Sequence, residues 1–176
     1  MTLWTKWKLW YEYKRFCKAY PIAKSKKNWN YIILHHSWSP DNKVTSDWEG
    51  IRQYHIKECG WKDIGYHFGI ELVNSAVQLK IGRSLETIGG HTKGFNETGI
   101  GVCLIGNYDL NILSNDQLKM FYFLCKRLME LYPDINAKHI LGHRETYPLL
   151  NKPVEKTCPG KLVSMNDIRN LISPET

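Results

Sequence analysis

The chain has 176 residues, five cysteines and a formal net charge of +7. This length suits one domain that buries a core without crosslinks. The cysteines are odd in number, include no C-x-x-C pair and stand mostly in apolar segments, so we expect reduced thiols and synthesis in a cytosol rather than a disulfide framework. No apolar run is long enough to span a membrane, which argues against a membrane-spanning class.

The positive charge is concentrated at the N-terminus. Residues 1–30 contain eight basic side chains and one acidic side chain, whereas the remaining residues contain 16 of each sign. Aromatic residues stand between the cations at a spacing close to a helical stripe. They include Trp4, Trp7, Trp10, Tyr13 and Phe16. We therefore expect a basic, aromatic and helical arm over residues 1–30, followed by a catalytic domain over residues 31–176.

Three roles for this arm remain open. Its aromatic side could pack on the domain while its cations stay solvated. Basic residues with interfacial tryptophans also suit an anionic cell-envelope surface. Stacking aromatics with lysines could bind nucleic acid, which is the least favoured role. The longest strictly apolar run, Leu9 to Tyr11, is too short for a signal peptide, so we expect synthesis in the cytoplasm and a separate export route.

Short apolar runs predict the strands of the domain. Strands are predicted at residues 31–34, 67–73, 77–81, 100–105 and 139–141. Asn74 and Ser75 separate the second strand from the third and predict a hairpin there.

Capping residues and apolar spacing predict the helices. Thr45 or Ser46 can cap a helix that ends at Gly60. Ser114 and Gln117 form a capping box that opens a helix ending before Pro133, and a last helix is expected over residues 166–172. Because strands alternate with helices, we expect one α/β domain with a mixed central β-sheet flanked by helices.

Metal-binding residue types stand in two distant segments. The first predicted strand leads directly into His35 and His36, and a late stretch contains His143 in LGHRE and Cys158 in KTCPG. Zinc binds imidazole nitrogen and thiolate sulfur, and catalytic zinc keeps one position open for water. Successive strand residues point to opposite faces, so this pattern does not choose between His35 and His36. Each residue by itself also suits a structural role.

Five segments, taken in order, resemble one known family. They are YIILHHS at residues 31–37, DIGYHF at 63–68, GGHTKGFN at 89–96, IGVCLIGN at 100–107, and GHRE at 142–145 with KTCPG at 156–160. Over residues 30–162 the chain is similar to the zinc-dependent N-acetylmuramoyl-L-alanine amidases. That superfamily includes the amidase-type lysozymes of bacteriophages and the peptidoglycan recognition proteins. The resemblance implies their fold and Zn²⁺ as the cofactor.

The resemblance also implies roles for single residues. The zinc ligands of the family match His35, His143 and Cys158. Tyr66 matches the tyrosine that hydrogen-bonds the zinc-bound water or the developing oxyanion. His36 is then expected to be a packed residue or a support for the ligands.

A lysine near the metal is expected to stabilise the oxyanion. Lys156 matches the lysine of the phage enzymes because it stands two residues before Cys158. The segment TYPLLNKPVE is longer than in the phage lysozymes to which the chain is similar, and it offers Lys152 as an alternative. The position of the KTC motif favours Lys156.

The segment from His91 to Asn96 resembles the groove wall that contacts muramic acid and the stem peptide. His91 and Asn96 are expected to be polar donors there, and Gly94 is expected to permit close approach. The three histidines inside predicted helices or strands are interpreted as structural: His55, His67 and His139.

The predicted function is zinc-dependent hydrolysis of the amide between N-acetylmuramic acid and L-alanine in peptidoglycan. We expect a monomeric phage or prophage endolysin that acts on the cell wall after release. Two alternatives remain: a noncatalytic peptidoglycan-binding module and an intracellular amidase that recycles muropeptides. Cys158 favours catalysis, because its loss commonly marks the noncatalytic relatives, and the basic arm favours a polymeric anionic target.

Overall fold

The computed structural model describes residues 3–41 and 47–173. The elements, in chain order, are α1 (Leu3–Ala19), β1 (Tyr31–His36), α2 (Asp47–Lys57), β2 (Phe68–Val73), β3 (Ala76–Ile81), β4 (Gly99–Leu104), α3 (Asn115–Leu131), the 3-10 turn η1 (Ala137–His139), β5 (Ile140–Gly142), α4 (His143–Leu149) and α5 (Met165–Ile172). Within these residues, no helix combines the length and the apolar character needed to cross a bilayer.

The strands form one mixed five-stranded sheet in the order β3-β2-β4-β1-β5. β1 is parallel to both β4 and β5, β2 is parallel to β4, and β3 is antiparallel to β2. The carboxyl ends of β1 and β5 therefore meet at the same edge of the sheet. The predicted α/β class with a mixed central sheet is confirmed.

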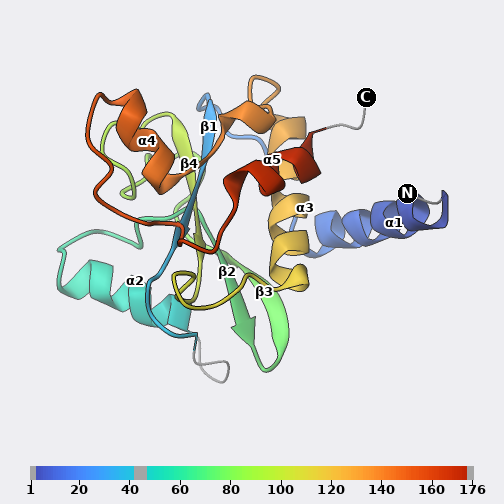
Figure 1. Cartoon of the computed structure of the whole chain (residues 1–176), viewed down its shortest axis with the longest axis horizontal. Coiled ribbons are helices and arrows are strands. Elements are labelled where there is room, and N and C mark those ends of the chain that lie inside the picture. The colour runs from blue at the N-terminus through green and yellow to red at the C-terminus, as the bar shows by residue number, and fades with distance from the viewer. Residues whose placement is uncertain (1–2, 42–46, 174–176) are drawn as a thin grey trace.

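Helices cover both faces of the sheet. Figure 1 shows α3 and α5 on one side of the strands, and α2 and α4 on the other. The strand residues alternate accordingly: Ile32 and Leu34 belong to the large core under α3, whereas Ile33 packs with Phe95 and Leu141 on the opposite face. His35 follows this alternation onto the face of Ile33.

The arm is a helix that is only partly packed. Tyr13 and Phe16 are buried, and both rings lie 5.8 Å from the ring of Phe123 in α3. The other end of α1 projects beyond α3 (Figure 1), and there Trp7 and Trp10 are 70% and 50% exposed.

The segment between α1 and β1 is anchored rather than loose. The Arg127 guanidinium donates to the carbonyl of Ile22 over 2.9 Å, and the backbone N–H of Ser25 donates to the Tyr132 hydroxyl over 2.9 Å. Trp29 is buried, and its indole N–H donates to the carbonyl of Leu85 over 3.0 Å. The segment of residues 20–30 is thus packed against the rest of the chain. The boundary expected at residue 30 stays a prediction.

Local sequence signals placed several elements well. Asn74 and Ser75 both have positive φ values, 49° and 62°, as a two-residue hairpin turn requires. The capping box at α3 is present, with Ser114 and Gln117 bonding reciprocally. The proposed cap at Thr45 or Ser46 lies outside the described residues.

Helix α4 was not expected. This helix has seven residues, and one of them is Pro148, a residue type that usually interrupts helices. Glu145 stabilises the start of this helix by accepting from the Gly142 N–H over 2.8 Å, and it pairs with Arg169 of α5 over 2.8 Å. The partner on α5 is a tertiary contact that no local pattern contains.

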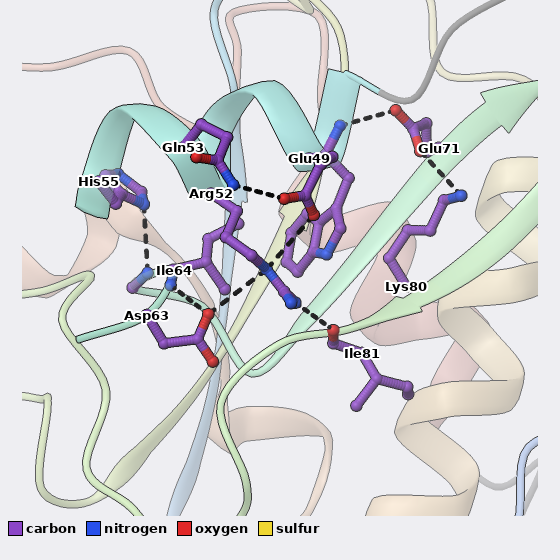
Figure 2. A network of polar contacts seen from close by, with 11 residues as sticks. Glu49, Arg52, Gln53, His55, Asp63, Ile64, Glu71, Lys80 and Ile81 are labelled. Carbon is purple, nitrogen blue, oxygen red and sulfur yellow. Dashed lines mark hydrogen bonds and ion pairs between the residues drawn. The ribbon is translucent and has the colours of Figure 1, made fainter. Parts of the chain in front are cut away.

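A polar network fixes α2 against the hairpin of β2 and β3 (Figure 2). The fully buried Glu71 accepts from the Trp48 N–H over 2.8 Å and pairs with Lys80 over 3.2 Å. Arg52 donates to the carbonyl of Ile81 over 2.8 Å and pairs with Asp63 over 3.4 Å. This network holds the helix that carries His55.

Candidate active site

Three predicted ligands meet at the carboxyl edge of the sheet. His35 lies at the end of β1, His143 begins α4 directly after β5, and Cys158 lies in the loop that precedes α5. Their ligand atoms all lie within 4.8 Å of one another. The fold therefore brings His35 next to two residues that stand more than a hundred positions later in the chain.

The arrangement fits zinc. His35 Nδ1 lies 3.6 Å from Cys158 Sγ. Two ligands on a tetrahedral zinc, at bond lengths of about 2.0 Å to nitrogen and about 2.3 Å to sulfur, are separated by about 3.5 Å. Two imidazoles and one thiol also match the donor set of a zinc site with an open fourth position.

The two histidines are neutral at pH 7. Burial lowers the pKa of His35 well below its usual value, and the neighbouring His91 and His143 lower it further. Burial and the nearby charge of Lys156 lower the pKa of His143 to about 4. Neutral imidazole is the form that binds metal, so both side chains are ready to act as ligands.

At neutral pH the Cys158 thiol is protonated. Burial raises its pKa to about 11, while the backbone N–H of His36 and the charges of Lys156 and Arg144 act against that rise. A bound cation inverts this preference, because it stabilises the thiolate directly. Metal binding is therefore expected to release one proton from this side chain.

Arg144 holds the loop that carries Cys158. Its guanidinium donates to the carbonyls of Thr157, Gly160 and Val163 over 2.9, 2.7 and 2.6 Å. Its backbone N–H donates to the carbonyl of Cys158 over 2.8 Å. Arg144 was not predicted to have a role, although it directly follows His143 in the GHRE motif.

A cavity of about 550 Å³ opens over the three ligands. Tyr66 lines it, with its ring centroid 5.2 Å from that of His35. Burial raises the pKa of Tyr66 well above its usual value, and Cys103 and Cys158 add to the shift. The phenol therefore stays protonated and can donate a hydrogen bond.

The two candidate lysines lie in different places. Lys156 lines the cavity, and its charge acts on both histidine ligands. Lys152 follows the end of α4, where its backbone N–H donates to the carbonyl of Tyr147 over 3.0 Å. This placement favours Lys156 for the role near the metal.

His91 lies beside His35 and lines the cavity, whereas Asn96 bonds to the backbone of the turn that carries His91. His91 Nδ1 lies 3.0 Å from His35 Nε2, and its Nε2 lies 3.0 Å from the carbonyl oxygen of Gly99. The Asn96 side-chain oxygen accepts from the backbone N–H groups of His91 and Thr92, both over 2.8 Å. Asn96 thus shapes the turn that carries His91.

Gly94, in the same segment, makes room for Leu150, the residue that follows α4. It has a φ of 89°, and a Cβ on it would come within 2.8 Å of Leu150. The close approach expected at this glycine is therefore made by a side chain of the protein.

Several residues that line the cavity were not predicted from the sequence, among them Trp38, His55 and Trp61. Trp38 is 69% exposed and has a φ of 61°, which is rare for a bulky residue. Trp61 and His55 also line the cavity, and their ring centroids lie 4.7 Å apart. His55 was interpreted as structural, but its Nδ1 accepts from the Gly65 N–H over 3.2 Å and the ring borders the cavity.

The remaining histidines have protein partners. His36 Nδ1 accepts from the Tyr108 N–H over 3.2 Å, and His67 Nδ1 accepts from the Gly101 N–H over 3.0 Å. His139 lies in η1, where its Nδ1 is 2.8 Å from the carbonyl oxygen of Asp134. These contacts agree with structural roles for His67 and His139.

A family model described as N-acetylmuramoyl-L-alanine amidase matches residues 25–161 of the chain. The chain belongs to this family. The expectation of an enzyme of the amidase class is thereby confirmed.

Two of the named relatives represent the two groups that the motifs indicated. An endolysin of Klebsiella phage KP32 is 34% identical over 112 residues, which cover 62% of this chain and 67% of the relative. Peptidoglycan-recognition protein SC2 of Drosophila melanogaster is 26% identical over 144 residues, covering 80% of this chain and 72% of the relative.

Solved structures agree on the fold. The N-acetylmuramoyl-L-alanine amidase LysC from Clostridium intestinale is 26% identical with a TM-score of 0.65, covering 86% of this chain and 90% of that one. Bumblebee PGRP-SA superposes with a TM-score of 0.68 at 24% identity. The match covers 88% of this chain and 93% of that one, and it shows the shared fold.

Proposed function

We propose that this amidase uses zinc to hydrolyse the amide between N-acetylmuramic acid and L-alanine in peptidoglycan, as a phage or prophage endolysin. The carrying observation is that the ligand atoms of His35, His143 and Cys158 lie within 4.8 Å of one another under an open cavity. The likeness to phage endolysins supports the biological setting. In that setting the protein is made in the host cytoplasm and acts on the wall after release.

The side chains of the cavity suit this reaction. Zinc, when bound by the three ligands, supplies a Lewis acid and lowers the pKa of water. The protonated hydroxyl of Tyr66 can donate to the carbonyl oxygen of the amide as that oxygen gains negative charge. The cation of Lys156, which also lines the cavity, adds positive charge on the same side.

Digestion of purified peptidoglycan tests the proposal. Mass spectrometry should find new L-alanine amino termini and intact glycan strands, with Cys158→Ala as the inactive control. New reducing sugar ends without new amino termini would show that the protein cleaves a different bond.

The two alternatives predict different products. A noncatalytic module would bind sacculi and release nothing, whereas the presence of Tyr66 beside all three ligands favours chemistry. A recycling amidase would cleave soluble muropeptides in preference to sacculi. The excess of positive charge in residues 1–30 favours the polymer, because opposite charge raises the rate of encounter.

We also propose that the projecting end of α1 contacts an anionic cell-envelope surface. Trp7, Trp10 and Tyr11 are 70%, 50% and 60% exposed there, and basic side chains stand among them. Interfacial tryptophans with cations suit such a surface. The packing of Tyr13 and Phe16 on α3 holds this end of the helix clear of the sheet.

A further inference from the structure

The ring of His35 has two nitrogens with different neighbours. Nδ1 faces the ligand cluster, since it lies 3.6 Å from Cys158 Sγ. Nε2 faces away from it and lies 3.0 Å from His91 Nδ1 and 3.2 Å from Thr92 Oγ1. A neutral imidazole carries one proton, so Nδ1 can bind a metal only if that proton is on Nε2.

The carbonyl of Gly99 determines where His91 carries its own proton. His91 Nε2 lies 3.0 Å from this oxygen, and a carbonyl oxygen can only accept. His91 Nε2 is therefore the donor, and in the neutral ring Nδ1 presents a lone pair to His35 Nε2. Two lone pairs at 3.0 Å would repel, so His35 must donate from Nε2.

We propose that His91 is a positioning residue, which holds His35 in the tautomer protonated at Nε2 and thereby frees Nδ1 for the metal. The inference rests on the ligand set of the proposed function. Metal-binding histidines generally donate their second N–H to an acceptor that fixes tautomer and orientation. Here that acceptor is another histidine, which a backbone carbonyl fixes in turn.

Packing keeps the His91 ring in this orientation. A Cβ on either Gly89 or Gly101 would overlap the ring, so the two glycines form a slot that only backbone can line. The His35 and His91 rings meet edge to face, with centroids 5.0 Å apart and planes at 81°. Both nitrogens of His91 are engaged within the protein, which favours this role over the substrate contact that the sequence suggested.

Zinc affinity, measured by competition with a chelator, tests the proposal. His91→Phe keeps a flat ring in the slot but removes both nitrogens, and we expect the affinity to fall about 10-fold to 100-fold. His91→Asn places an amide oxygen near the former Nδ1 and should restore most of the loss. Thr92→Val, which removes the hydroxyl that lies 3.2 Å from His35 Nε2 and 3.1 Å from His91 Nδ1, should have a smaller effect. Unchanged zinc affinity in His91→Phe would overturn the proposal.

A second measurement reads the tautomer directly and requires neither metal nor catalysis. Long-range ¹H–¹⁵N NMR spectra of the metal-free wild type at neutral pH should show His35 protonated at Nε2. Protonation at Nδ1 would overturn the proposal even if His91→Phe fails to fold. Both readouts are independent of amide cleavage. A protein that passes them and leaves peptidoglycan intact would refute the proposed function alone.

Discussion

The ligand edge of the sheet, formed by His35, His143 and Cys158, and the projecting end of α1 differ in what fixes their side chains. At the ligand edge, backbone carbonyls, glycines and Arg144 hold the side chains in place. At the projecting end, the ring centroids of Trp7 and Trp10 lie 5.9 Å apart, and both side chains are largely exposed. The proposed chemistry at the ligand edge depends on the exact positions of its side chains. The proposed binding by α1 depends on which residue types are exposed there.

The largest effect is expected from removing a ligand. Cys158→Ala or His35→Ala should abolish both zinc binding and peptidoglycan cleavage, because two remaining ligands cannot form the site. Metal analysis of the wild type should find about one zinc per chain. A Cys158→Ala protein that cleaves peptidoglycan without zinc would contradict the claim that activity requires all three ligands.

Tyr66→Phe should separate chemistry from metal binding. The variant retains the ring near His35 but loses the donor, so zinc content should be unchanged while kcat falls about 100-fold to 1000-fold. Steady-state kinetics on a soluble muropeptide measures this. An unchanged kcat would remove Tyr66 from the mechanism.

Packing of α1 can be separated from its exposed surface. Phe16→Ala should lower the free energy of unfolding by about 3 kcal/mol, because it empties a buried site against α3. The double variant Trp7→Ala with Trp10→Ala should change it by no more than about 0.5 kcal/mol.

The same double variant should weaken sedimentation with anionic vesicles at low salt. Wild-type binding to nucleic acid but not to vesicles would favour the nucleic-acid role instead. Equal vesicle binding by both proteins would leave the exposed tryptophans without the proposed function.

Acid should destabilise the zinc-free protein through its buried histidines. Burial lowers the pKa of His143 and of His67 to about 4, below the unfolded value of about 6.5. The unfolded state binds more protons between these values, so the free energy of unfolding is largest above pH 6.5 and falls as the pH drops towards 4. Each histidine contributes at most about 1.4 kcal/mol per pH unit.

Urea titrations at several pH values measure this slope. Helix α1 contains no histidine, so Trp7→Ala with Trp10→Ala serves as a control that should leave the slope unchanged. His67→Gln should reduce it. A free energy of unfolding that stays constant from pH 7 to 4 would contradict the burial of neutral histidines.

Local signals in the sequence predicted much of the fold. The Ser114 capping box, the hairpin at Asn74 and the strands of the sheet all depend on neighbours in the chain, and these predictions are confirmed. Helix α4 could not be predicted in this way, because Pro148 suggests a break and Arg169 of α5 helps to stabilise it.

The sequence by itself determined the family, the residue types of the proposed zinc site and the uneven distribution of charge. Only the tertiary structure placed His35 on the face of the ligand cluster and gave His36 a partner in Tyr108, because strand alternation separates two neighbours without saying which face the site occupies. It also revealed His91 behind His35 and Arg144 beneath Cys158. Those contacts join segments that are distant in the chain, and only folding brings them together.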